Sequence, residues 1–124
     1  MDKENKEILL KYLCEMLPYG VICRYDTVVP LLGEVLNNGE LQEIRNRGKY
    51  FIVNGATCLY DDIKPYLRPM SSMTKDEAAM IYNLKAEESF DELFDYYNER
   101  HLDYRGLIPK GLGLEAPSDM YKIE

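Results

Sequence analysis

The sequence predicts an α+β fold in which an N-terminal helix and a small β meander precede two further helices and a docked tail. Residues 1–62 contain short strand-like segments separated by Asn-Gly pairs, which are typical of β hairpins. Residues 74–124 contain two helix-start signals and then a stretch rich in glycine and proline. The 124-residue length suits a single domain, with residues 63–73 linking its two parts.

Residues 4–17 predict the N-terminal helix. Apolar side chains recur at helical spacing along one face, namely Ile8, Leu9, Tyr12, Leu13, Met16 and Leu17. Pro18 and Gly20 follow, and both residue types are common just beyond the end of a helix. We expect the apolar face to pack on the protein's own sheet; binding of a partner by this helix is the alternative.

Two strands are predicted next, over residues 20–25 and 28–36. Pro30 lacks an N–H group and therefore confines its end of the second strand to an edge or a bulge. Asn38-Gly39 favours a type I′ turn and predicts a hairpin. A two-residue turn there would place Glu34 opposite Glu43, which is unfavourable, so the register stays open.

A second Asn-Gly pair, Asn54-Gly55, predicts a hairpin between residues 49–53 and 56–60. Its two-residue turn would pair Val53 with Ala56, Ile52 with Thr57, Phe51 with Cys58 and Tyr50 with Leu59. These pairs suit a half-buried pleated surface. The strands together predict an antiparallel meander, and its closure into a small SH3-type barrel is left open.

Residues 63–73 predict a stiff connection. Pro65 and Pro69 push the residues before them toward extended backbone, so we expect residues 64–69 to cross the surface as a proline strap. Thr74 and Glu77 then have the spacing of a capping box, which predicts a helix through about Leu84.

A second capping box at Ser89 and Glu92 predicts the last helix. Its apolar face would comprise Phe90, Leu93, Phe94, Tyr97 and His101. Its outer face is acidic, with Glu87, Glu88, Asp91, Glu92, Asp95, Glu99 and Asp103. Solvation explains such a face, and mimicry of a nucleic acid is the alternative.

Residues 103–124 predict an irregular tail that docks on the body. Glycines and prolines prevent long regular structure, while Leu107, Ile108, Leu112 and Leu114 gain free energy from burial. Asp103 or Arg105 would cap or pair locally, and Gly106 would take a positive φ, which together fix a reversal of the chain.

The composition of the chain favours some classes of partner and one cellular compartment over others. The net charge of −7 disfavours nucleic acid, because like charges repel at long range. Eleven tyrosines and no tryptophan suit half-buried positions and protein contacts. An odd cysteine count of 3 and an N-terminus without an apolar stretch predict reduced thiols in the cytoplasm, with no membrane association.

The sequence predicts no catalytic residues, no cofactor and no metal. Residues 111–116 match the letters G-x-G-x-x-A, but no strand precedes them and Pro117 follows, so the dinucleotide-binding context is missing. Cys14, Cys23, Cys58 and His101 lack the close spacing of a zinc site. We expect His101 to be packed, with one ring nitrogen bonded to the backbone.

Two segments, residues 63–74 and 101–121, resemble a family of short uncharacterised proteins from gut Bacteroidales genomes and their prophages or mobile elements. The resemblance is carried by Ile63-Lys64-Pro65-Tyr66-Leu67-Arg68-Pro69-Met70-Ser71-Ser72-Met73-Thr74, Asp103-Tyr104-Arg105-Gly106-Leu107-Ile108 and Gly111-Leu112-Gly113-Leu114-Glu115-Ala116-Pro117. It is looser before residue 60 and departs at Pro109, where a charged residue is more usual, and at Gly113, where alanine is expected. The resemblance implies a mobile-element context and brings no catalytic residues.

We therefore expect a non-enzymatic protein-interaction module of a prophage or mobile element, whose partner is another protein. The predicted partner-binding residues are Tyr66, Arg68, Asp103, Tyr104 and Arg105. The alternative is a small nucleic-acid-binding module, whose predicted contacts at a strand end are Arg45, Arg47 and Lys49. The partner's identity and the oligomeric state stay open.

Overall fold

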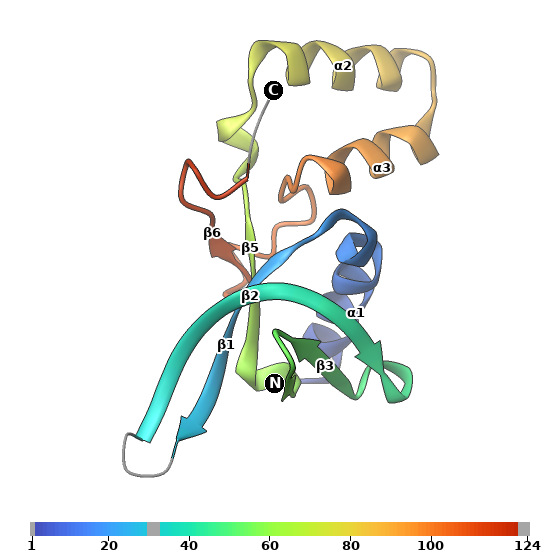
Figure 1. The fold of residues 1–124 in the computed structure, drawn as a ribbon. Coiled ribbons are helices and arrows are strands. Elements are labelled where there is room, and N and C mark those ends of the chain that lie inside the picture. The colour runs from blue at the N-terminus through green and yellow to red at the C-terminus, as the bar shows by residue number, and fades with distance from the viewer. Residues whose placement is uncertain (1, 30–32, 122–124) are drawn as a thin grey trace.

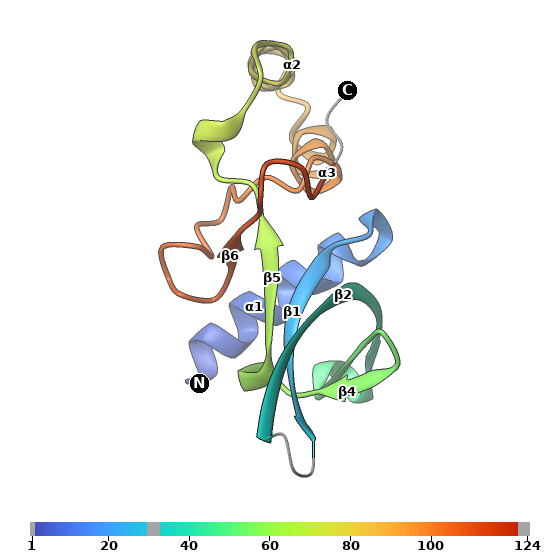
Figure 2. The same cartoon turned by 60° about the vertical axis from the view of Figure 1, so that its left-hand side comes forward.

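The computed structural model describes residues 2–29 and 33–121, and it confirms the α+β class. The elements in chain order are α1 (Lys3–Met16), β1 (Ile22–Val29), β2 (Gly33–Arg45), β3 (Tyr50–Val53), β4 (Ala56–Cys58), β5 (Ile63–Leu67), α2 (Lys75–Ala86), α3 (Phe90–Glu99) and β6 (Leu114–Glu115). Helix α1 lies beside the sheet, and α2 and α3 stand beyond the end of β5 (Figures 1 and 2).

The sheet has six strands in the order β4-β3-β2-β1-β5-β6. Strands β1 to β4 form the predicted antiparallel meander, β5 pairs antiparallel with β1, and β6 pairs parallel with β5. Strand β2 is long and strongly curved (Figure 1), so its first part pairs with β1 and its second part with β3. The order ends at β4 and β6, which are the edges of a curled, mixed sheet.

The hairpin turn predicted at Asn38-Gly39 is wrong, because both residues lie inside β2 and pair with Arg24 and Cys23 of β1. Residues 28–36 are consequently not one strand, since β1 runs through Val29 and β2 begins at Gly33. This arrangement avoids the unfavourable glutamate pair. Pro30 lies outside the described residues.

Gly39 has a packing role in place of the turn role. A Cβ atom at this position would lie 3.0 Å from the Cβ of Asn54 and 3.2 Å from a methyl carbon of Val53. A glycine inside a strand often marks such a close approach at a bend. Gly39 therefore lets the curved strand β2 pass close to the β3–β4 turn.

The hairpin predicted at Asn54-Gly55 is confirmed. Both residues have positive φ, 51° and 80°, as a type I′ turn requires. Three of the predicted pairs form as expected: Val53 with Ala56, Ile52 with Thr57 and Phe51 with Cys58. Strand β4 ends at Cys58, so the fourth predicted pair lies beyond the ladder.

The proline strap is extended, as predicted, but it does not cross the surface. Its first residues form strand β5 inside the sheet, with Ile63, Pro65 and Leu67 buried and the side chains between them more exposed. This alternation has the period of a half-buried strand. Pro65 is tolerated there because β6 pairs only with Tyr66 and Leu67, beyond the proline.

The main core lies between α1 and the sheet and confirms the predicted helix face. Asp2 is the N-cap of α1, and its side chain accepts a hydrogen bond of 2.8 Å from the N–H of Asn5. The fully buried large side chains of this core are Leu9, Tyr12, Leu13, Met16, Val21, Phe51, Val53, Ile63, Leu67 and Leu107. Leu107 and Leu112 belong to this cluster, so the tail is docked as predicted.

A second cluster joins α2, α3 and the segment after α3, and it comprises Ile81, Leu84, Leu93, Tyr97 and Leu102. The capping box at the start of α2 is confirmed: the Thr74 hydroxyl accepts from the N–H of Glu77, whose carboxylate accepts from the N–H of Thr74. The predicted second box is wrong, since the Ser89 side chain caps nothing. Glu88 has φ 56° and the Ser89 N–H donates to the carbonyl of Leu84, so the α2–α3 reversal uses these residues instead.

The predicted apolar face of α3 is divided. Leu93 and Tyr97 are buried in the second cluster, whereas Phe90 and Phe94 are 51% and 44% exposed. His101 lies beyond the helix with φ 58°. Helix α3 therefore presents two aromatic rings to solvent.

The two clusters are joined by a buried ionic contact, which we call the Glu77 cluster and define as Glu77, Arg68 and Arg100. The Glu77 carboxylate is 1% exposed and accepts two bonds of 2.7 Å from Arg68 and one of 2.8 Å from Arg100. Arg68 also donates to the carbonyls of Arg100 and Ser72. The bonds from Arg68, and to a lesser degree those from Thr74 and Arg100, lower the pKa of Glu77 from 4.5 to about 2, although burial opposes the shift.

We predict that Gly55→Val lowers the melting temperature. No atom lies within 4 Å of a Cβ placed at Gly55, so the cost comes from the left-handed backbone, about 1–2 kcal/mol. Thermal unfolding followed by circular dichroism measures it. Gly55→Asn is the control, because asparagine tolerates this conformation, and equal melting temperatures for the two variants would contradict the turn assignment.

We predict that Glu77→Gln lowers stability at neutral pH and flattens its acid dependence. Because the folded-state pKa of Glu77 is depressed, its contribution is complete above the unfolded pKa of about 4.5 and is lost as the pH falls toward 2. The loss in the wild type is on the order of 3 kcal/mol. Urea unfolding between pH 7 and pH 2 measures it, with the exposed carboxylate variant Glu99→Gln as control. A Glu77→Gln variant with the wild-type slope would refute this assignment.

Candidate functional site

Two of the predicted partner-binding residues are buried. Arg68 is 5% exposed and bound to Glu77, and Asp103 is 7% exposed. The Asp103 carboxylate accepts from the N–H groups of Leu107 and Ile108 at 2.8 and 2.9 Å, and Gly106 has φ 76°. These two side chains hold the fold together, and the predicted reversal at Asp103–Gly106 is confirmed.

The other three predicted residues are partly exposed. The Tyr66 hydroxyl donates to the side chain of Asn38 at 2.9 Å. Tyr104 and Arg105 both bind Glu15 of α1, through a hydroxyl bond of 2.8 Å and a guanidinium bond of 2.6 Å. The structure thus brings Tyr104 and Arg105 together against α1, while Tyr66 lies on β5.

The predicted basic cluster lies at the end of β2 and in the following 3₁₀ turn, Asn46–Gly48. Arg45, Arg47 and Lys49 are all exposed. Arg45 forms an ion pair of 2.7 Å with Glu43 of the same strand. The strand-end position is as predicted, and contact with nucleic acid stays a prediction.

The histidine and the three cysteine thiols lie in settings that disfavour their charged forms. The ring of His101 stacks on Tyr121 at 3.8 Å, and its Nε2 lies 2.8 Å from the carbonyl oxygen of Tyr19, as predicted for a packed histidine. Burial lowers the pKa of His101. Burial also raises the pKa of the thiols of Cys14, Cys23 and Cys58, which disfavours the thiolate form.

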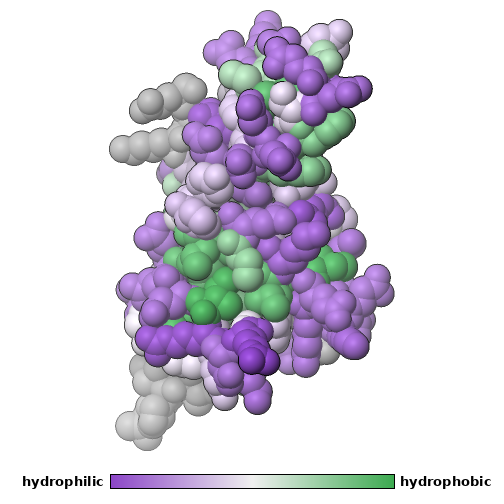
Figure 3. Space-filling view, turned by 90° about the vertical axis from the view of Figure 1, so that its right-hand side faces the viewer, coloured by the Kyte–Doolittle hydropathy of each residue, from purple (hydrophilic) through white to green (hydrophobic). Residues whose placement is uncertain are grey.

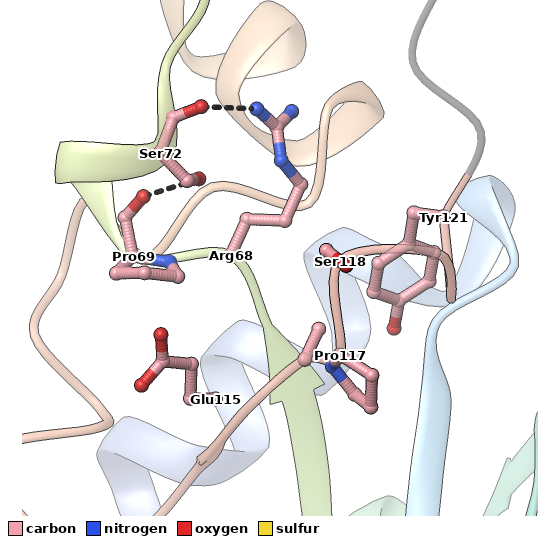
Figure 4. Close-up of a pocket in the computed structure, with 8 residues that line it drawn as sticks. Arg68, Pro69, Ser72, Glu115, Pro117, Ser118 and Tyr121 are labelled. Carbon is pink, nitrogen blue, oxygen red and sulfur yellow. Dashed lines mark hydrogen bonds between the residues drawn. The ribbon is translucent and has the colours of Figure 1, made fainter.

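One hollow, of about 250 Å³, lies between the end of β5 and the tail. Figure 4 shows its walls, in which the Arg68 guanidinium turns to the carbonyl of Ser72 and the Ser72 hydroxyl to that of Pro69. The Arg68 guanidinium and the Ser72 hydroxyl of this hollow are therefore already hydrogen-bonded.

A second, wider hollow of about 500 Å³ lies between the end of α1 and the length of α3. We call it the α1–α3 groove; its lining residues are Cys14, Glu15, Pro18, Tyr19, Asp91, Phe94, Asp95 and Asn98. The four α3 residues follow helical spacing and form one stripe. Figure 3 views the side that carries α1 in Figure 1 and shows apolar side chains gathered in the middle of this face, with polar ones around them.

Asn98 distinguishes the groove from the rest of the surface. Its side chain is 3% exposed, and its Oδ1 atom has no hydrogen-bond partner among the described residues. Leaving a buried acceptor unpaired costs about 1–3 kcal/mol, and native proteins keep few such groups. Beside it, Phe94 is 44% exposed. The groove therefore combines a buried, unpaired acceptor with an exposed aromatic ring.

Sequence reasoning missed this groove. It assigned Asp91 and Asp95 to a solvated face and Phe94 to the core, and it did not consider Asn98. One signal was available, because Asn98 lies four residues after Phe94 and directly follows Tyr97 on the same helix. The opposing wall comes from α1, so the groove depends on tertiary packing that no local pattern reports.

Neither the scan against protein-family models nor the searches of curated proteins and solved structures finds a match to this chain. Among residues 2–29 and 33–121, no helix combines the length and the apolar composition that crossing a bilayer requires.

We predict that Asn98→Leu raises the melting temperature. Leucine is close in shape to asparagine and removes the unpaired acceptor, whose cost is about 1–3 kcal/mol. Differential scanning calorimetry measures the change, with the exposed neighbour variant Glu99→Leu as control. A clear drop in stability for Asn98→Leu would mean that the amide makes a stabilising bond in the folded protein.

Proposed function

We propose that this protein is a non-enzymatic protein-interaction module that binds another protein through the α1–α3 groove. The observation that carries the proposal is the unpaired Oδ1 atom of the buried Asn98 in the wall of the groove. A partner that turns this buried amide toward the groove and supplies a donor would remove a cost that the free protein bears. The exposed ring of Phe94 would add the apolar contact that interfaces concentrate at their centres.

Several features support an interaction role over an enzymatic one. His101 is stacked and bonded, and burial raises the pKa of the thiols. The groove instead offers an aromatic ring, an amide and carboxylates, which are groups suited to recognition. The resemblance of residues 63–74 and 101–121 to mobile-element proteins supports a role in a prophage or mobile element. Three free cysteines agree with a reducing, cytoplasmic compartment.

We predict that Phe94→Ala abolishes capture of the partner. Tagged wild-type protein expressed in its native host would retain the partner, identified by mass spectrometry, and the variant would lose it because the groove loses its apolar contact. Phe90→Ala is the matched control, since Phe90 on α3 has a similar exposed fraction but does not line the groove. Equal capture by the wild type and both variants would contradict the proposal.

The nucleic-acid alternative makes a different prediction. With a net charge of −7, the protein should bind duplex DNA or single strands no tighter than high micromolar at physiological salt. Fluorescence anisotropy against labelled oligonucleotides measures this. Tight, salt-sensitive binding that disappears in an Arg45→Ala, Arg47→Ala double variant would favour the alternative.

A further inference from the structure

We propose that the α1–α3 groove recognises an arginine side chain in a basic segment of the partner protein. This inference rests on the proposed function and names the chemistry of the bound residue. One stripe of α3 carries exposed carboxylates and an exposed aromatic ring, and the same stripe holds the buried Asn98 with its unpaired amide oxygen. Guanidinium is the side-chain group that satisfies all three, because it is planar, cationic and carries only donors.

The charge of the groove selects a cation. Asp91 and Asp95 line the α3 wall and are exposed, whereas Glu15 on the α1 wall is already paired with Arg105. Glu88, Glu92 and Glu99, which lie close to these residues in the sequence, are also exposed. Such a field attracts a basic segment and repels phosphate groups, so a basic peptide fits and a nucleic acid does not.

The aromatic ring provides a plane for stacking. Phe94 stacks on Tyr104 with ring centroids 5.7 Å apart, and Tyr104 stacks on Tyr97 at 4.6 Å. This row of rings holds Phe94 in place while 44% of the residue stays exposed. Arginine stacks on aromatic faces more readily than lysine does, because its cation is planar and weakly hydrated.

The protein already contains one example of this recognition at the neighbouring position. The guanidinium of its own Arg105 lies 5.1 Å from the ring centroid of Tyr104 and donates to Glu15 at 2.6 Å. The groove repeats the combination of a ring and a carboxylate with Phe94 and Asp95. A second arginine, supplied by a partner, would extend the same arrangement along α3.

Asn98 provides an acceptor that only a donor-bearing ligand can use. Asp95 and Asn98 are three residues apart on α3, so their side chains lie about one helical turn apart on the same stripe. The Oδ1 atom is buried in the free protein, so the amide must turn about its broad terminal torsion for the oxygen to reach the groove. One guanidinium can then donate to the carboxylate and to the amide oxygen from different nitrogens.

The test is a titration of the full-length protein with a short acetylated peptide, Ala-Lys-Ala-Arg-Ala-Lys-Ala, followed by ¹⁵N NMR. Matched peptides carry lysine or the neutral analogue citrulline in place of arginine. We expect the arginine peptide to bind and to shift the side-chain amide signal of Asn98. The lysine peptide should bind several-fold more weakly, and the citrulline peptide at least about tenfold more weakly.

Variants of the protein give the second arm. Asn98→Leu and Asp95→Asn should each weaken binding of the arginine peptide by about tenfold. Asp76→Asn, which removes an exposed carboxylate on α2, should leave the affinity for this peptide unchanged. Arginine and citrulline peptides of equal affinity would overturn the inference, as would shifts confined to residues outside the groove. If Phe94→Ala still abolishes capture of the partner, the proposed function survives that failure; if capture is also unaffected, both fail.

Discussion

The carboxylate of Glu77 is the contact on which the arrangement of the two halves depends. It is buried, and a charge can remain buried only if it is paired and hydrogen-bonded. Its partners come from three places in the chain: the end of β5, the start of α2 and the end of α3. Backbone bonds from Arg68 to His101 and from Asp103 to Arg68 reinforce the same junction. Directional polar contacts thus fix how the helical pair meets the sheet.

That junction also sets the relative position of the two walls of the groove, because the helix that forms each wall packs in a different apolar cluster. Helix α1 packs in the main core, α3 packs in the second, and Tyr104 contacts both. Tyr104 and Arg105 both bind Glu15, and these bonds fix the α1 wall against the segment that follows α3. A groove between two units of this kind keeps its shape only while the polar junction stays intact. The shape of the groove and the stability of the fold are therefore coupled.

Features that depend only on residues close together in the sequence could be predicted. The Asn54-Gly55 turn and the Thr74 cap need only neighbouring residues, and both are present as expected. Features that depend on distant partners could not: Gly39 looked like a turn residue but relieves crowding against Val53, and β5 looked like a surface strap because its partner strand lies far back in the chain. Asn98 belongs to this second kind. Only the folded arrangement shows that its buried Oδ1 atom has no hydrogen-bond partner among the described residues.

The docked tail sets a condition on how the chain folds during synthesis. Leu107 and Leu112 fill the main core beside α1, although about ninety residues of sequence separate them from that helix. A ribosome would therefore present α1 and the meander with an open apolar face until the segment leading into β6 emerges. Non-local contacts of this kind slow folding and expose intermediates to aggregation. Chaperones that bind nascent chains would bind the apolar face of the sheet that is still uncovered at that stage.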